Sequence, residues 1–185
     1  MLVLIAMLRG VNVGGHNQIK MEALRELLVS LKFTSPQTYV QSGNVIFQSS
    51  EPDLDKVAKR IQRGIEKKFG CRPEVVLRTA DELRAAVAKN PFAKRRGIDP
   101  AKLLVSFLAG KPLPGASEEL ARQKFGPEEL HLVGREIYIY FPNGMGKTKL
   151  PWSRLDKILG PPGTGRNWNS VTRMLQMAEA QEADR

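Results

Sequence analysis

The sequence predicts an α+β protein made of two tandem ferredoxin-like subdomains, each with an antiparallel sheet and its helices on one face. Two observations lead to this prediction. Over residues 1–78, apolar runs typical of strands and apolar stripes at helical spacing follow one another in the order β-α-β-β-α-β. After residue 101 the order β-α-β-β-α recurs without a clear last strand. Each helix has a single apolar stripe to bury, which favours helices packed on one side of a sheet.

The first half is expected to contain four strands and two helices. Val3–Leu8 is a continuous apolar run that suits a central strand. Ser42-Gly43 is a two-residue hairpin signal. Ser50 is expected to cap the second helix, with Pro52 in its first turn. The expected order is a strand at 3–8, a helix at about 20–32, strands at 38–41 and 44–48, a helix ended by Gly70, and a strand at 73–78.

A connector and a second subdomain are expected to follow. Thr79 and Glu82 have the spacing of a capping box, which predicts a helix start at Thr79. We expect residues 79–101 to form a connecting helix and a basic loop, and residues 102–185 to form the second subdomain with an extra C-terminal helix. The expected elements there are strands at 102–108, 129–133 and 136–141 and helices at 117–125, 152–159 and 171–180.

Composition narrows the classes of function. Twenty-nine Lys and Arg against nineteen Asp and Glu give a net charge of +10, which favours anionic partners such as nucleic acid, nucleotides or acidic metabolites. The single cysteine, Cys71, excludes an internal disulfide and fits a reducing, cytoplasmic location. One cysteine and two histidines are too few for a zinc site of the usual kind, so we expect no metal and no cofactor. No apolar stretch approaches the length of a membrane span, so a soluble protein without a membrane partner is expected.

Five segments together resemble a bacterial family catalogued as a domain of unknown function, number 1697. They are Leu8-Arg9-Gly10-Val11-Asn12-Val13-Gly14-Gly15, Thr38-Tyr39-Val40-Gln41-Ser42-Gly43-Asn44-Val45, Asn90-Pro91-Phe92, Gly146-Lys147-Thr148-Lys149-Leu150 and Arg166-Asn167-Trp168-Asn169. The resemblance covers nearly the whole chain and implies tandem subdomains related to the ferredoxin-like unit. It supplies no catalytic residues. Gly163-Thr164-Gly165 departs from the family pattern, which leaves the shape of that segment open.

The leading functional hypothesis is binding of a small anion, a phosphorylated or carboxylated metabolite, in a glycine-bearing basic cleft. Three glycines after the first expected strand can let backbone N–H groups line a concavity for an anion, although they also suit a plain tight turn. The cradle is expected from Arg9, Asn12, Gly14 and Gly15. Further lining is expected from Gln41, Ser42, Asn44, Lys147, Lys149, Arg166 and Asn167.

Two of these lining segments have a competing interpretation. Gly144 to Thr148 resembles a phosphate-binding P-loop, but Phe141 stands where that motif needs glycine, so a P-loop is excluded. A solvated lysine pair or an anion clamp at Lys147 and Lys149 remains. Next to Arg166 and Asn167, Trp168 is typical of a core anchor at a helix start.

The alternative hypothesis is a protein that binds single-stranded nucleic acid. Its surface is a row of cations at helical spacing on the second helix, opposite the apolar stripe, which also suits an ordinary solvated face. The residues are Lys56, Lys59, Arg60, Arg63 and Lys67, with Tyr138 and Tyr140 as candidates for base stacking. A protein-interaction scaffold is a third hypothesis, and an enzyme is left open because no catalytic set is recognisable from spacing.

Overall fold

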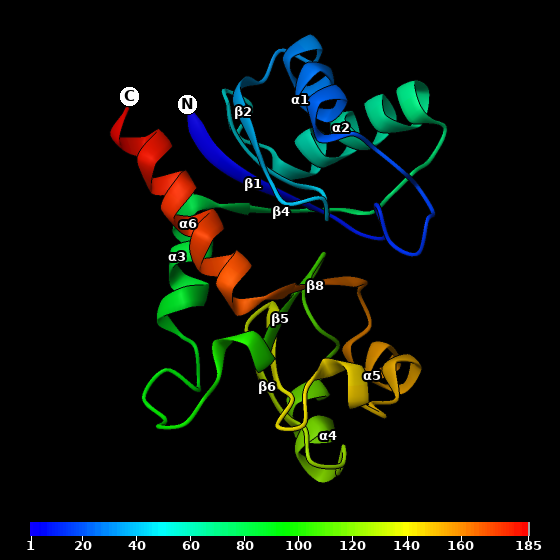
Figure 1. The fold of residues 1–185 in the computed structure, drawn as a ribbon, viewed down its shortest axis with the longest axis vertical. Helices are drawn as coiled ribbons and strands as arrows, with labels where there is room; N and C mark the ends of the chain where they lie inside the picture. The colour runs from blue at the N-terminus through cyan, green and yellow to red at the C-terminus, as the bar shows by residue number, and fades with distance from the viewer. Residues whose placement is uncertain (185) are drawn as a thin grey trace. The chain divides into compact units, whose positions relative to one another are not determined.

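The computed structural model describes residues 1–184, and within them it has two four-stranded antiparallel sheets and six α-helices (Figure 1). The α+β class and the tandem ferredoxin-like arrangement predicted from the sequence are therefore confirmed. Contacts divide the chain into two compact units. Unit 1 holds Met1–Ala85 and the segment from Arg173 onward, and unit 2 holds Ala86–Thr172.

Unit 1 is built on a sheet with the order β2-β3-β1-β4. The central strand β1 pairs antiparallel with both β3 and β4. Both α1 and α2 cover the same face of this sheet (Figure 1). The elements are β1 (Leu2–Leu8), α1 (Met21–Ser30), β2 (Thr34–Tyr39), β3 (Asn44–Ser49), α2 (Leu54–Phe69) and β4 (Val75–Thr79).

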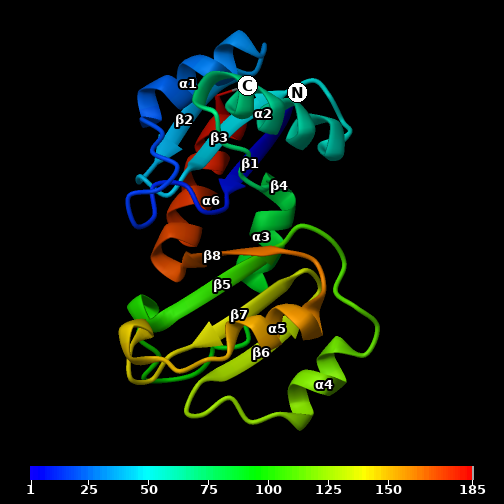
Figure 2. The same ribbon diagram turned by 90° about the vertical axis from the view of Figure 1, so that its right-hand side faces the viewer.

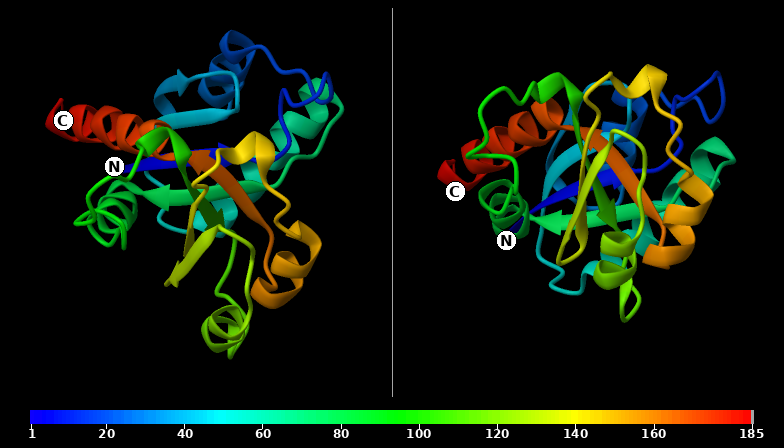
Figure 3. Two further views of the ribbon diagram at one scale, coloured as in Figure 1. Left: turned by 60° about the horizontal axis from the view of Figure 1, so that its bottom comes forward. Right: turned by 90° about the horizontal axis from the view of Figure 1, so that it is seen from below.

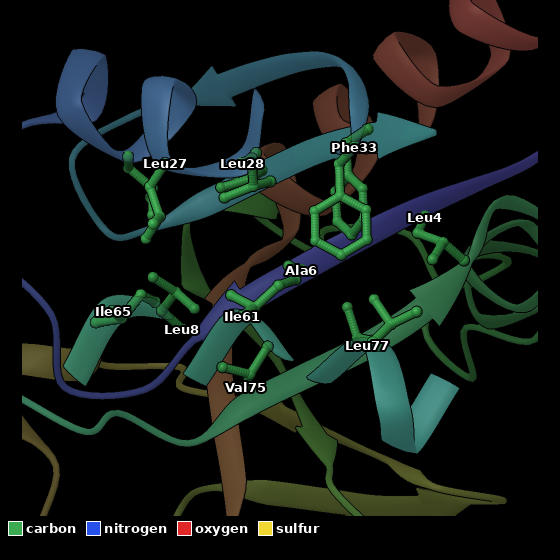
Figure 4. Packing of buried hydrophobic residues seen from close by; sticks show 14 of the residues in the cluster. Leu4, Ala6, Leu8, Leu27, Leu28, Phe33, Ile61, Ile65, Val75 and Leu77 are labelled. Carbon is green, nitrogen blue, oxygen red and sulfur yellow. The ribbon is translucent and has the colours of Figure 1, made fainter. Parts of the chain in front are cut away.

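The core of unit 1 lies between that sheet face and the two helices. Leu4, Ala6 and Leu8 alternate along β1 toward the helices, as the two-residue period of a strand requires (Figure 4). On α2, Val57, Ile61 and Ile65 form the buried stripe, which leaves the opposite side of the helix to charged residues.

Unit 2 repeats the topology with the sheet order β6-β7-β5-β8. Its helices α4 and α5 lie beside one face of that sheet (Figures 2 and 3). Its elements are two short 3₁₀ turns, at Pro100–Lys102 and Met145–Lys147, with β5 (Leu103–Leu108), α4 (Ala116–Arg122), β6 (Glu129–Val133), β7 (Glu136–Tyr140), α5 (Trp152–Leu159) and β8 (Gly163–Asn167). The last strand of each sheet runs directly into a further helix, namely α3 (Ala80–Ala88) after β4 and α6 (Trp168–Ala183) after β8.

Helix ends follow local chemistry, with one correction. Thr79 and Glu82 form the predicted capping box: the Thr79 amide donates to the Glu82 carboxylate at 3.0 Å, and the Glu82 amide donates to the Thr79 hydroxyl at 3.1 Å. Ser50 is not the cap of α2. Asp53 is, because its carboxylate accepts from the amides of Asp55 and Lys56. The helix starts at Leu54, so its first turn does not include a proline.

Two strands differ from the sequence prediction. β2 begins at Thr34, four residues earlier than predicted. Its pairing with β3 shifts register between Thr34 and Gln37. β8, which the sequence left undefined, pairs antiparallel with β5 from Leu104↔Asn167 to Leu108↔Gly163. A Cβ atom on Gly163 would lie 2.7 Å from the Ser106 hydroxyl, so glycine permits this close pairing. Across residues 1–184, no helix has both the length and the apolar character needed to cross a membrane.

Candidate anion-binding surfaces

The loop after β1 is held together by one side chain, Asn12. Its amide nitrogen donates to the carbonyl oxygens of Ile19 at 2.9 Å and Gln41 at 2.7 Å, and its amide oxygen accepts from the Ile19 N–H at 2.7 Å. Its backbone is left-handed, with φ of 56°. These bonds tie the 9–20 loop to the turn between β2 and β3. The Asn12 amide therefore shapes the loop and has its hydrogen-bonding groups engaged there.

A pocket of about 410 Å³ lies beside this loop. Lys20 is the one charged residue among its lining side chains, and Arg9 is exposed nearby in the sequence without lining it. Helix α1 begins at Met21 with no side chain capping its first turn, which leaves backbone N–H groups at that end. The lining residues are Asn12, Gly15, Gln18, Ile19, Lys20 and Gln41.

The turn that precedes β3 is also stabilised internally. Asn44 is fully buried, and its amide donates to the Tyr39 carbonyl at 3.1 Å and to the Ser42 hydroxyl at 2.9 Å. Gly43 has φ of 75°, and a Cβ there would lie 2.9 Å from the Leu8 Cβ. Ser42 and Asn44 thus contribute to the shape of the turn that Asn12 holds from the other side.

The remaining residues predicted to line the cleft belong to unit 2. Lys147 and Lys149 are exposed. Arg166 is buried, with its guanidinium donating to the Thr164 hydroxyl at 2.7 Å, and burial lowers its pKa to about 10. Asn167 donates to the Ala101 carbonyl at 2.9 Å and accepts from the Asn169 N–H at 3.0 Å. That these residues and the 9–15 loop of unit 1 line a single cleft stays a prediction.

The two candidate stacking tyrosines are buried in unit 2. Tyr138 has no exposed surface, its hydroxyl donates to the Ala86 carbonyl at 2.6 Å, and burial raises its pKa. Tyr140 is 8% exposed and its ring centre lies 5.8 Å from that of Phe92. Neither ring lies on the surface, so the nucleic-acid hypothesis depends on the helix alone.

The predicted cation row on α2 lines a larger pocket, of about 640 Å³, within unit 1. Its lining residues come from α2, from Leu31 after α1 and from Glu51 before α2. All five predicted cations line it. The full lining is Leu31, Glu51, Lys56, Lys59, Arg60, Arg63, Gly64 and Lys67. We refer to it below as the α2 pocket.

Two of the five cations are held by unit 1 itself. The Arg60 guanidinium donates to the Leu31 carbonyl and lies 4.2 Å from the centre of the Phe33 ring. The Lys56 ammonium is 3.8 Å from the Asp53 carboxylate. These contacts partly orient the two side chains before any ligand arrives.

The other three cations are Lys59, Arg63 and Lys67. Each is exposed, and within the described residues none has an ion pair or a side-chain hydrogen bond. They are spaced by four residues, which places them one above another on the helix. Glu66, which lies beside the row on α2, pairs instead with Arg72 at 3.7 Å. The α2 pocket therefore carries a row of three cations without an ion pair among the described residues.

Two features of this pocket have no signal in the sequence. The contact between Arg60 and the end of α1 joins residues 29 apart in the chain. Gly64 lets the two helices approach, because a Cβ there would lie 2.9 Å from a Leu31 methyl group. Neither contact has a periodic pattern, so neither could be read from spacing.

The fold and its surfaces define a tandem ferredoxin-like α+β protein with a basic pocket on its first unit. No described group of three or more His, Cys, Asp or Glu residues has the arrangement of a metal site. The family model described as "Protein of unknown function (DUF1697)" matches residues 1–138, and the chain belongs to that family.

One solved structure shows the same fold over nearly the full chain. It is the conserved bacterial protein SP0830 from Streptococcus pneumoniae, 21% identical, with a TM-score of 0.74, covering 96% of this chain and 98% of that one. At this identity the likeness concerns the fold alone. A search of curated proteins gave no match.

Proposed function

We propose that the protein binds a phosphate-bearing anion in the α2 pocket of unit 1. The observation that supports this function is the row Lys59, Arg63 and Lys67, which faces the pocket without a carboxylate partner among the described residues. Like charges four residues apart destabilise a helix by about 0.2–0.5 kcal/mol per pair. Two such pairs lie in the row, and a bound anion would relieve their repulsion.

The pocket beside the 9–20 loop is a second candidate for a small phosphorylated or carboxylated ligand. It is favoured by the uncapped start of α1 next to Lys20, since free N–H groups at a helix start attract anions. It ranks below the α2 pocket because one cation lines it, against five. The two candidates are separated by substitution at Lys20 and on α2.

The test is a thermal-shift measurement with inorganic pyrophosphate and a nucleoside monophosphate. A ligand at ten times its Kd stabilises the native state by about 1.4 kcal/mol, which for a chain of this size raises Tm by about 3–6 °C. We expect the double variant Lys59→Glu with Arg63→Glu to lose the shift. A control with the same change in net charge is Lys111→Glu with Lys157→Glu, both exposed on unit 2, and it should keep the shift.

The result that contradicts the α2 pocket is a shift that survives the double variant and disappears in Lys20→Glu. That outcome assigns the anion to the loop pocket. No shift with any phosphate or carboxylate ligand contradicts both candidates.

A further inference from the structure

We propose that the ligand of the α2 pocket is single-stranded nucleic acid, held by its phosphodiester backbone. This inference rests on the proposed function and names its substrate class. The helix rises about 1.5 Å per residue, so Lys59, Arg63 and Lys67 are spaced by about 6 Å along the axis and the row extends over about 12 Å. Neighbouring phosphates along one extended strand are separated by a similar interval. A single phosphate is too small to contact all three cations.

The pocket lacks the usual equipment for a compact phosphate. Such sites gather backbone N–H groups at a helix start or in a nest. The start of α2 is already occupied, because the Asp53 carboxylate accepts from its first amides, and Asp55 adds a second negative charge there. A compact phosphate at that end would meet two carboxylates. The positive charges instead form a line that begins one turn further along the helix, which suits a linear polyanion.

One strand fits the α2 pocket better than a duplex. Its cations all lie on α2, and its lining residues outside that helix are Leu31 and Glu51. A duplex presents a second row of phosphates, and the pocket has no second row of cations to neutralise it. The partly oriented Arg60 lies between the row and Leu31, where it is placed to support the same backbone. One concave surface with one row of cations therefore matches one phosphodiester chain.

Recognition should be independent of base sequence. None of the residues that line the pocket is aromatic, so the stacking that distinguishes bases has no platform there. Binding then depends on phosphate neutralisation and the accompanying release of counterions. For single strands the slope of log Kobs against log salt is about −0.7 per phosphate, which gives about −2 for the three cations of the row.

The experiment is fluorescence anisotropy with a labelled 12-nucleotide oligo(U) over a series of salt concentrations. We expect a slope near −2 for the full chain, and each single change, Lys59→Ala, Arg63→Ala or Lys67→Ala, should reduce its magnitude by about 0.7. The triple alanine variant should lose binding. Its matched control removes three exposed lysines of unit 2, Lys111, Lys124 and Lys157, and should bind as the unaltered chain does. Circular dichroism melting confirms that each variant is folded.

Further ligands make the outcomes decisive. The 12-mer should bind at least about tenfold more tightly than a dinucleotide, because only the longer chain reaches every cation of the row. A 12-base-pair duplex and phosphatidylserine vesicles should bind more weakly than the single strand. Tighter binding of the duplex or the vesicles, or a triple variant that binds as well as its control, would overturn the nucleic-acid proposal.

The failure of this proposal is distinguishable from that of the proposed function. If pyrophosphate still raises Tm through Lys59 and Arg63 while the 12-mer binds no better than the dinucleotide, a small phosphate ligand stands and the strand is rejected. If neither pyrophosphate nor the 12-mer binds, both are rejected.

Discussion

Replacing Tyr138 by Phe removes a single oxygen from the interior of unit 2, and its effect follows from one hydrogen bond. The hydroxyl donates at 2.6 Å to the carbonyl of Ala86, which lies in the last turn of α3. Carbonyls in the last turn have no partner within their helix. The loss of a neutral hydrogen bond and the burial of an unpaired carbonyl together predict a fall of about 1–3 kcal/mol in the free energy of unfolding.

The stability lost in Tyr138→Phe is also expected to depend on pH, and to become smaller at high pH. Burial raises the pKa of Tyr138 above that of the unfolded chain, so the unfolded state loses this proton first as the pH rises. The stabilisation is complete below pH about 10 and declines above it by at most about 1.4 kcal/mol per pH unit. Phe does not titrate. The difference between the native chain and Tyr138→Phe should therefore shrink between pH 10 and 11.

The assay is urea unfolding followed by tryptophan fluorescence at pH 8, 10 and 11. Trp152 and Trp168 both belong to unit 2, so the signal reports on the unit that is altered. The other tyrosines are unchanged and cancel in the comparison. A difference that stays constant from pH 8 to 11, or one below about 0.5 kcal/mol at pH 8, would refute the reasoning from burial.

Two further changes test the turn and the helix cap of unit 1. Gly43→Ala combines a left-handed backbone with a Cβ 2.9 Å from the Leu8 Cβ and should destabilise by about 2–4 kcal/mol in urea unfolding. Its control is Gly15→Ala, where φ is similar but no atom lies within 4 Å of the added Cβ. This change should lower the free energy of unfolding by about 1–2 kcal/mol. Equal losses from the two changes would contradict the steric argument. Asp53→Ala should cost about 1 kcal/mol, and an equal loss from Ser50→Ala would show that the cap of α2 lies earlier.

Local patterns were sufficient for most of the fold. The apolar run of β1, the stripe of α2 and the capping box at Thr79 are each contained in a few consecutive residues, and each predicted the correct element. The two strands that differ, β2 and β8, are at the edges of their sheets. β2 is largely exposed and β8 contains two glycines, so neither segment has the apolar run or alternation that identified the other strands.

The candidate site was less readable because its hydrogen bonds are not local in sequence. The charges at Lys59, Arg63 and Lys67 follow from helical spacing alone. The state of each cation does not: Lys56 is paired, Arg60 rests on Phe33, and the row has no partner among the described residues. Some polar loop residues predicted to contact a ligand instead form side-chain hydrogen bonds to backbone groups of the protein, as Asn12 does. Spacing cannot distinguish those two uses.

Comparison of the two sheets separates what the fold requires from what it leaves open. In unit 1, Ile5 of β1 is paired in register with Arg78 of β4, and in unit 2, Val105 of β5 is paired with Arg166 of β8. The two arginines therefore occupy equivalent positions. The residue after each arginine, Thr79 or Asn167, accepts a bond from the first turn of the helix that follows. A motif present at the same place in both units is explained by the strand-to-helix junction, and this structural role weakens the case for Arg166 and Asn167 as ligand residues.

The same comparison supports the proposal that the ligand site lies on α2. It corresponds in order to α5, yet α2 has sixteen residues and α5 has eight. Lys59, Arg63 and Lys67 extend over a length of helix that α5 lacks, so the shared topology does not require them. Within the described residues, none of the three side chains of the row has an ion pair. A row of cations that the shared topology does not require supports the proposal of a bound partner of opposite charge.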